Sequence, residues 1–148
     1  MSRVAADIVV PGRAAEAEEL WYDRHRWPAW IDGFGHVLGL EGDWPQVGAR
    51  LVWVSPPRGR GRVQERVTAY EPRGGQTVEV EDKRLRGTQT VTFEPAGGEV
   101  RVTLTLDYEL KERTVVTPLV DLFFIRRELG DSLRRTLTRF RHERRAEL

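Results

Sequence analysis

The sequence contains no cysteine, which excludes disulfide bonds, a thiol nucleophile and thiolate metal ligands. Its three histidines, His25, His36 and His142, are too far apart to form a recognised metal-binding motif. The sequence also has no phosphate-binding loop, dinucleotide fingerprint or nucleophile elbow. We therefore predict a protein without a metal site or a cofactor.

Long apolar runs are missing as well, since no stretch approaches the roughly 20 residues that a transmembrane helix needs. The first residues lack the basic and apolar regions of a signal peptide. These two absences predict a cytoplasmic protein that does not insert stably into a membrane.

The net charge is small, because 24 Lys and Arg residues stand against 23 Asp and Glu residues and leave a formal charge of +1. This balance argues against a protein that coats nucleic acid. Arginines do gather in residues 58–62 and 126–145, but turn residues flank the first run and acidic residues interrupt the second. We interpret both runs as solvated surfaces and predict no nucleic-acid partner.

Apolar residues follow two different periods in the first part of the chain. Residues 4–10 alternate between apolar and other side chains, which is typical of a strand with one buried face. Residues 14–22 then show apolar side chains at three- and four-residue spacing, which predicts a helix. Pro28 prevents a simple continuation of that helix, so we expect a bend and a short second helix over residues 23–32.

Six further strands are predicted, separated by turns that contain glycine or proline. We expect them at about residues 34–42, 48–55, 61–71, 76–83, 86–95 and 99–110. The connections are too short for crossover helices, so these strands should pair antiparallel.

After Arg113 the period becomes helical again. Thr117 and Pro118 resemble an N-cap and a first helical residue, and an apolar stripe runs on to about Arg145.

This order of elements resembles the helix-grip fold of the START-like (SRPBCC) superfamily. The residues that carry the resemblance are 23–30 (DRHRWPAW), 44–50 (WPQVGAR), 67–72 (VTAYEP) and 133–140 (LRRTLTRF). Within the superfamily the chain is most similar to the polyketide cyclase/dehydrase and lipid-transport group. The resemblance implies one α+β domain over residues 1–148. In it, a curved antiparallel sheet of about seven strands wraps around the long C-terminal helix and leaves a cavity for a hydrophobic ligand.

Tryptophans are the main candidates for contact with a ligand in such a cavity. In the resembled fold the bend and the neighbouring strand flank the cavity mouth, which favours Trp27, Trp30 and Trp53. The predicted ligand-binding set is completed by Phe34, Tyr108, Leu129 and Leu133.

The strand over residues 61–71 carries the candidate catalytic side chains. Its apolar phase consists of Val63, Val67 and Ala69. Glu65 shares that phase and should point inward. Arg66 and Tyr70 belong to the opposite phase, and a twist or a bulge would be needed to turn one of them into the cavity. We take Glu65, Arg66 and Tyr70 as the candidate catalytic residues, and the sequence leaves open which face lines the cavity.

Three functions stay open at this stage. The first is the binding of a small or mid-sized hydrophobic molecule that is aromatic, polyketide-like or lipid-like. The second is a polyketide aromatase/cyclase or dehydrase that acts on a bound poly-ketone. In the resembled cyclases a cavity arginine and a tyrosine stand where this chain has Tyr70 and Phe34. The third is a protein-interaction or membrane-surface module that uses residues 115–124. The expected partner is a small hydrophobic molecule, and a homodimer is the other association considered.

Overall fold

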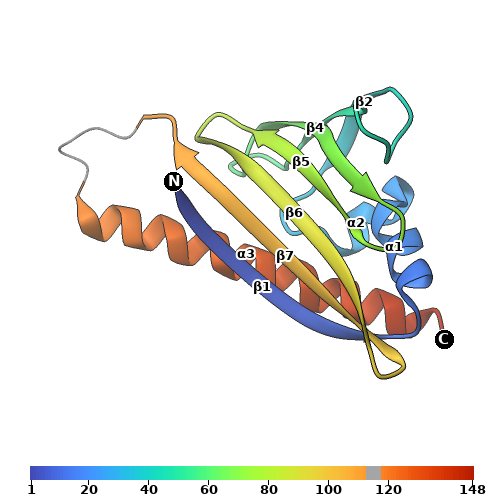
Figure 1. Cartoon of the computed structure of the whole chain (residues 1–148). Coiled ribbons are helices and arrows are strands. Elements are labelled where there is room, and N and C mark those ends of the chain that lie inside the picture. Colours follow the sequence, from blue (N-terminus) through green and yellow to red (C-terminus); the bar gives the residue numbers. More distant parts are fainter. Residues whose placement is uncertain (113–117) are drawn as a thin grey trace.

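The computed structural model describes residues 1–112 and 118–148 (Figure 1). Its strands are β1 (Ser2–Pro11), β2 (His36–Glu41), β3 (Arg50–Val54), β4 (Arg62–Glu71), β5 (Gly75–Glu81), β6 (Leu85–Ala96) and β7 (Glu99–Leu110). Its helices are α1 (Ala14–Tyr22), the 3-10 turn η1 (Arg24–Arg26), α2 (Trp27–Trp30) and α3 (Leu119–Ala146). The strands form one antiparallel sheet in the order β1-β7-β6-β5-β4-β3-β2. The predicted α+β helix-grip architecture is confirmed.

Strand β7 shows how the alternating pattern builds the core. Its inward side chains are 0–4% exposed: Val100, Val102, Leu104, Leu106 and Tyr108. The side chains between them are more accessible to water, so one face of the strand is buried and the other faces solvent. The turn before β7 uses Gly97 and Gly98 at φ 61° and 85°, in the left-handed region that glycine adopts without strain.

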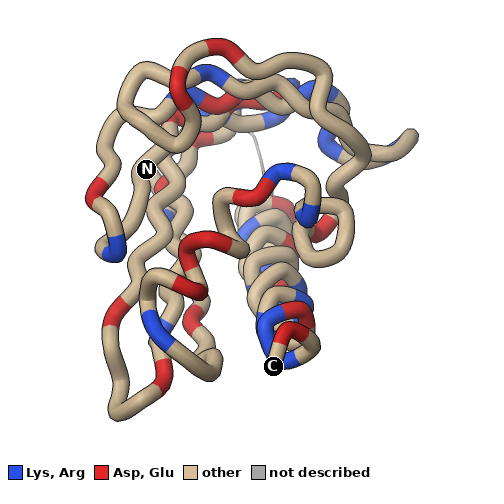
Figure 2. Tube along the Cα trace, turned by 90° about the vertical axis from the view of Figure 1, so that its right-hand side faces the viewer, with Lys and Arg blue, Asp and Glu red and all other residues tan. Residues whose placement is uncertain are grey.

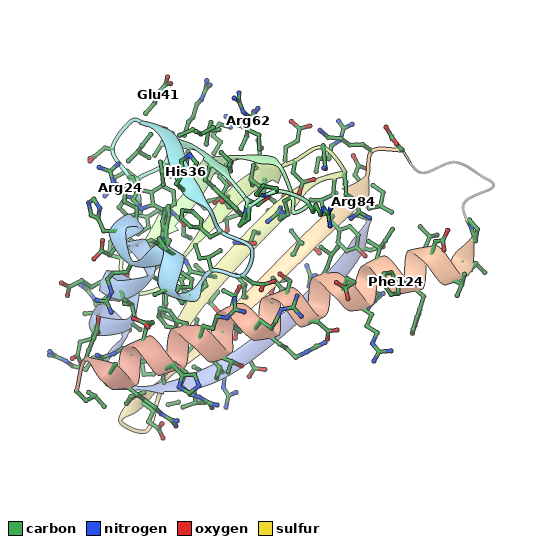
Figure 3. All side chains as sticks on the ribbon, turned by 180° about the vertical axis from the view of Figure 1, so that it is seen from behind. Arg24, His36, Glu41, Arg62, Arg84 and Phe124 are labelled. Carbon is green, nitrogen blue, oxygen red and sulfur yellow. The ribbon has the colours of Figure 1, made fainter. Side chains whose placement is uncertain are left out.

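Helix α3 lies beneath the arch of the sheet (Figure 2). It has 28 residues and is therefore roughly 42 Å long at 1.5 Å per residue. Its C-terminal half buries Leu133, Leu137 and Phe140. Its first turns extend beyond the sheet (Figure 1), and their apolar side chains are 63–83% exposed: Leu119, Val120, Phe123 and Phe124. Figure 3 shows Phe124 pointing away from the sheet. Neither α3 nor any other helix in the described residues combines the length and the apolar character needed to cross a membrane.

The predicted N-cap of this helix, Thr117, lies outside the described residues, as do Val115 and Val116 of the proposed interaction segment. The described helix is preceded by Pro118, which occupies the N-cap position.

The C-terminal end of α3 is fixed to the start of α1. Arg144 is only 3% exposed, and its Nη2 donates to Oε2 of Glu16 at 2.9 Å. Its Nη1 donates to Oε2 of Glu147 at 3.1 Å. Gly12 leaves room for this guanidinium, because a Cβ at Gly12 would lie 2.5 Å from Arg144 Nη2. Any larger side chain at position 12 would therefore displace Arg144.

Candidate ligand cavity

A cavity of about 80 Å³ lies between the inner face of the sheet and the helices. Strands β3 to β7 form one wall, and α2 and the middle of α3 form the opposite wall. Its apolar lining consists of Trp21, Trp27, Trp30, Ile31, Trp44, Leu51, Trp53, Val78, Val80, Val91, Leu104 and Leu133. Its polar lining consists of Asp32, Arg60, Glu65, Gln76, Gln89, Ser132 and Thr136. Aromatic and aliphatic side chains that converge with polar groups in one cavity are typical of small-molecule sites.

The short helix α2 places two tryptophans in the wall. Pro28 occupies its first turn, where a missing backbone N–H costs no helical hydrogen bond. Trp27 and Trp30 are three residues apart, so they project from the same side of the helix. Trp30 packs against Trp21 and Phe140, with ring centroids 4.5 and 5.1 Å apart, and is 1% exposed. The bend therefore forms a rigid aromatic part of the cavity.

The indole N–H of Trp30 is buried without a hydrogen-bond partner among residues 1–112 and 118–148. Three other tryptophans of the cavity lining, Trp27, Trp44 and Trp53, donate hydrogen bonds through their indole N–H groups. Trp27 Nε1 donates to the carbonyl oxygen of Trp21 at 2.8 Å. Trp44 Nε1 donates to the carbonyl oxygen of Tyr22 at 3.1 Å. Trp30 thus contributes to the wall a donor that no described protein group uses.

Glu65 enters the cavity wall from β4. It follows the same face as Val63 and Val67, which are 0% and 1% exposed. Its Oε2 accepts a hydrogen bond from Trp53 Nε1 at 2.7 Å. Burial raises the pKa of Glu65, while this hydrogen bond and the charge of Arg60 act in the opposite direction. The cavity therefore has an acid–base group in its sheet wall.

Arg60 reaches the same wall from the loop between β3 and β4. Its Nε donates to Oδ2 of Asp82 at 2.8 Å, and its guanidinium carbon lies 5.6 Å from the Trp53 ring centroid. Asp82 also accepts hydrogen bonds from the backbone N–H groups of Arg84 and Leu85. Burial raises the pKa of Asp82, but the charge of Arg60 and these hydrogen bonds outweigh it and lower the pKa. Arg60 is thus held in place, and our interpretation of it as a solvated turn residue was wrong.

Asp32 joins the bend after α2 to α3 beside the cavity. Its carboxylate accepts hydrogen bonds from Arg135 and Arg139 at 3.1 Å and from Ser132 at 2.7 Å. Its backbone N–H donates to Thr136 Oγ1 at 3.0 Å. Burial raises the pKa of Asp32, but the hydrogen bonds of Arg135 and Ser132 and the nearby charges lower it overall. This carboxylate therefore positions the two helices that form one cavity wall.

The two cavity carboxylates do not form a metal site. Asp32 is bonded to arginines on the helical side, whereas Glu65 is bonded to Trp53 on the sheet side. In the part of the chain that the structure describes, no group of three His, Asp or Glu side chains could hold a metal ion.

A larger hollow of about 710 Å³ lies on the outer face of the sheet. Its outward-facing charged residues are Glu41, Arg50, Arg66, Glu79, Glu81, Arg86 and Glu109. Ion pairs link neighbouring strands across it, as between Arg66 and Glu79 at 2.8 Å and between Arg86 and Glu109 at 3.4 Å. Such a charged, solvent-facing surface offers little to an apolar ligand, so the inner cavity is the better candidate site.

The family model for polyketide cyclase/dehydrase and lipid-transport proteins matches residues 1–143. The chain belongs to this family. No curated protein sequence matches the chain.

Several solved structures share the fold of this chain at low sequence identity. A START superfamily protein from Mycobacterium smegmatis aligns with a TM-score of 0.76 at 14% identity, covering 99% of both chains. TTHA0849 from Thermus thermophilus aligns with a TM-score of 0.74 at 19% identity, again covering 99% of both. DynU16, from the dynemicin biosynthetic locus, aligns with a TM-score of 0.65 at 18% identity, covering 96% of this chain and 46% of DynU16. At these identities the likeness concerns the fold alone.

The structure brings together some of the predicted ligand-binding residues of this family member. The cavity lining includes Trp27, Trp30, Trp53 and Leu133. Phe34 is absent from the lining and instead packs against the rings of Trp27 and Trp53, at 6.0 and 5.2 Å between centroids. Tyr108 is a buried residue of the core, and Leu129 packs against that core without lining the cavity. These three residues support the fold and do not line the site.

Two of the three predicted catalytic residues lie outside the cavity. Arg66 points to the outer face, where both it and its ion-pair partner Glu79 are about half exposed. A bulge between Val67 and Ala69 in β4 reverses the alternation, so Ala69 is exposed. Tyr70 turns inward as a result, but it packs against Tyr22, at 5.6 Å between ring centroids, and does not reach the cavity. Glu65 alone of the three predicted residues lines the cavity.

Other cavity residues were missed by the sequence analysis. Gln76 shares the strand phase of Val78 and Val80, and Gln89 shares that of Val91. Because each is a polar residue among the inward-facing apolar residues of its strand, the sequence could have identified both as candidates for the cavity lining. Arg60 gave no such signal, because its position depends on Asp82, 22 residues further along the chain.

Proposed function

We propose that this protein binds a small, mainly apolar molecule in the cavity between the sheet and α3. The observation that carries the proposal is the aromatic wall of Trp27, Trp30 and Trp53, which stands in the same cavity as seven polar side chains. Membership of a family described by cyclase, dehydrase and lipid-transport activities is consistent with ligand binding. The protein would then act as a binding or carrier module.

The volume of the cavity favours a compact ligand. Drug-sized ligands occupy pockets of roughly 300–1,000 Å³, whereas this cavity measures about 80 Å³. A complete polyketide or lipid would require the wall to move. The Arg60 loop is one wall segment whose side chain is held by an ion pair with Asp82, and its displacement would enlarge the cavity.

An enzymatic role is the second candidate, and Glu65 is the observation that favours it. A buried carboxyl group with a raised pKa inside a cavity has the character of a general acid or base. A cyclase or dehydrase of this kind would use Glu65 to move a proton of a bound ketone. Arg66 would not participate, because it lies on the outer face of the sheet.

Native mass spectrometry of the purified protein tests the binding proposal directly. One defined small molecule that co-purifies at a fixed stoichiometry, and is lost in Trp30→Ala, would support it. Phe124→Ala is the matched aromatic control, because Phe124 is 63% exposed and far from the cavity lining. A protein without any bound compound, whose tryptophan fluorescence also fails to respond to small apolar molecules, would contradict the proposal. Turnover that collapses in Glu65→Gln would favour the enzyme.

A further inference from the structure

A basic groove of about 280 Å³ lies between β1 and the first half of α3. Its lining contains four arginines: Arg3, Arg126, Arg127 and Arg134. No acidic residue of the described chain lines it, although Asp121 and Glu128 belong to the same part of α3. The ligand cavity is lined by other α3 residues, Ser132, Leu133 and Thr136. The groove is therefore a separate surface, on another side of the helix from the cavity.

Two of the four arginines are available to an external anion. Arg126 and Arg127 are exposed, and neither forms an ion pair with another residue of the described chain. The other two have aspartate partners: Arg3 pairs with Asp107 and Arg134 pairs with Asp131. The groove thus keeps an excess of positive charge after its internal pairs are formed.

The groove continues into an exposed apolar tip of α3, which consists of Leu119, Val120, Phe123 and Phe124. Phe123 belongs to both surfaces, since it lines the groove and is 69% exposed. The tip extends beyond the sheet in Figure 1, and Phe124 points away from the sheet in Figure 3. Apolar side chains that project beside unpaired arginines match an anionic bilayer, because its phosphate groups lie just outside its acyl chains.

We propose that this end of the protein docks reversibly on a membrane surface that contains anionic phospholipids. Arg126 and Arg127 contact lipid phosphates, while the apolar tip enters the boundary of the acyl chains. A second copy of the chain fits less well, because it would bring the same unpaired arginines together. A soluble polyanion would leave the tip in water. This inference goes beyond ligand binding in the cavity and does not depend on it.

Sedimentation of the full chain with vesicles tests the docking. Vesicles of phosphatidylcholine alone are compared with vesicles of phosphatidylcholine and phosphatidylglycerol in a two-to-one ratio. We expect binding to the mixed vesicles that weakens with added salt, and much weaker binding to phosphatidylcholine. Arg126→Gln combined with Arg127→Gln should lower the affinity for mixed vesicles by roughly thirtyfold, which is about fivefold for each arginine.

The control is Arg24→Gln combined with Arg145→Gln, which removes the same charge from two other exposed arginines. Arg145 lies roughly 27 Å from Arg127 along α3, at 1.5 Å per residue. Arg24 belongs to η1, which is linked to the C-terminal half of α3 by the ion pair of Arg26 with Glu143. Because charges are screened over about 8 Å at physiological salt, this control should bind mixed vesicles like the wild type.

The absence of cysteine from the chain allows the tip to be located directly. Phe124→Cys, labelled with an environment-sensitive fluorophore, should shift its emission to the blue on mixed vesicles and be quenched by nitroxides on the acyl chains. Val47→Cys is the matched control, because Val47 is 62% exposed and lies between β2 and β3. Phe123→Ala combined with Phe124→Ala should weaken vesicle binding by roughly tenfold or more. Both side chains are mainly exposed, so this variant should fold.

Several results would overturn the proposal. Equal binding to the two kinds of vesicle would remove the arginines from the interface, and unchanged emission from the label at position 124 would leave the tip in water. Release from vesicles by glycerol phosphate or polyglutamate, at an ionic strength where chloride has no effect, would indicate a site for soluble anions. A dimer that dissociates when Phe123 and Phe124 are replaced would indicate a second copy. Native mass spectrometry tests the cavity separately, so none of these results decides the proposed function.

Discussion

Asp82 accepts a hydrogen bond from Arg60 at 2.8 Å and thereby holds the Arg60 guanidinium above the ring of Trp53. The indole N–H of Trp53 in turn donates a hydrogen bond to Glu65. The Asp82 side chain is only 3% exposed, whereas Arg60 is one-third exposed. The chain thus uses a buried carboxylate on one hairpin to position a cation from another. This pair connects the stability of the protein to the electrostatics of its cavity.

Replacement of Asp82 should therefore affect both properties. We expect Asp82→Asn to lower the free energy of unfolding by about 1–3 kcal/mol, because a charged hydrogen bond to Arg60 is lost at a buried site. Denaturant titration measures this change. Glu79→Gln is the matched control, since the ion pair of Glu79 with Arg66 is exposed and should contribute much less. Equal losses in the two variants would show that Asp82 has no special structural role.

Asp32 should make the protein sensitive to acid. Its pKa is lowered in the folded state from an ordinary value of 3.8. A lowered folded pKa gives stability that is present above pH 3.8 and is lost as the pH falls through the folded pKa. We expect Asp32→Asn to cost about 1 kcal/mol at neutral pH, and the difference from wild type to shrink below pH 4. Urea titrations from pH 3 to 7 measure it. A difference that is independent of pH would contradict this role.

Glu65 should change the pH dependence of stability in the opposite direction to Asp32. Its folded pKa is raised above the ordinary 4.5 by burial, so the stability linked to its neutral form is present below pH 4.5. That stability is lost as the pH rises through the folded pKa. Glu65→Gln keeps the acceptor for Trp53 but cannot ionise. We therefore expect the variant to gain stability relative to wild type between pH 4 and 8, as measured by thermal or urea unfolding. A constant offset across that range would mean that Glu65 ionises without penalty.

Leucines on the two halves of α3 should differ sharply in their contribution to stability. Leu133 is 7% exposed and packs in the core, so Leu133→Ala should cost on the order of 2–5 kcal/mol. Leu119 on the same helix is 83% exposed, and Leu119→Ala should change stability by less than about 0.5 kcal/mol. Denaturant titration compares the two. A larger loss of stability in Leu119→Ala than in Leu133→Ala would contradict the packing of the C-terminal half of α3 against the sheet.

Local patterns in the sequence were sufficient to predict most of the fold. The alternation in residues 100–108 and the helical spacing in residues 129–140 each depend on near neighbours only, and both match the observed burial. The turn at Gly97 and Gly98 was similarly evident from two adjacent residues. Such features depend on backbone preference and on one buried face, and a single sequence contains both.

The cavity was less predictable because its residues meet through distant contacts. The inward direction of Glu65 followed from its strand phase, and the structure places it in the cavity wall. The bulge before Ala69 carries no clear local signal, yet it exposes Ala69 and turns Tyr70 toward Tyr22. Arg60 and Asp82 meet only after two hairpins have formed. Periodicity cannot predict these tertiary contacts.

The contact of Arg144 with Glu16 has a consequence for how the chain folds during translation. A translating ribosome releases β1 before the other strands, and α3 follows every strand of the sheet. Until α3 emerges, the inner face of the sheet lacks the part of its cover that α3 provides. Contacts over such sequence separations form slowly and leave apolar surface open in the meantime. The nascent chain therefore acquires a closed cavity only after synthesis of α3.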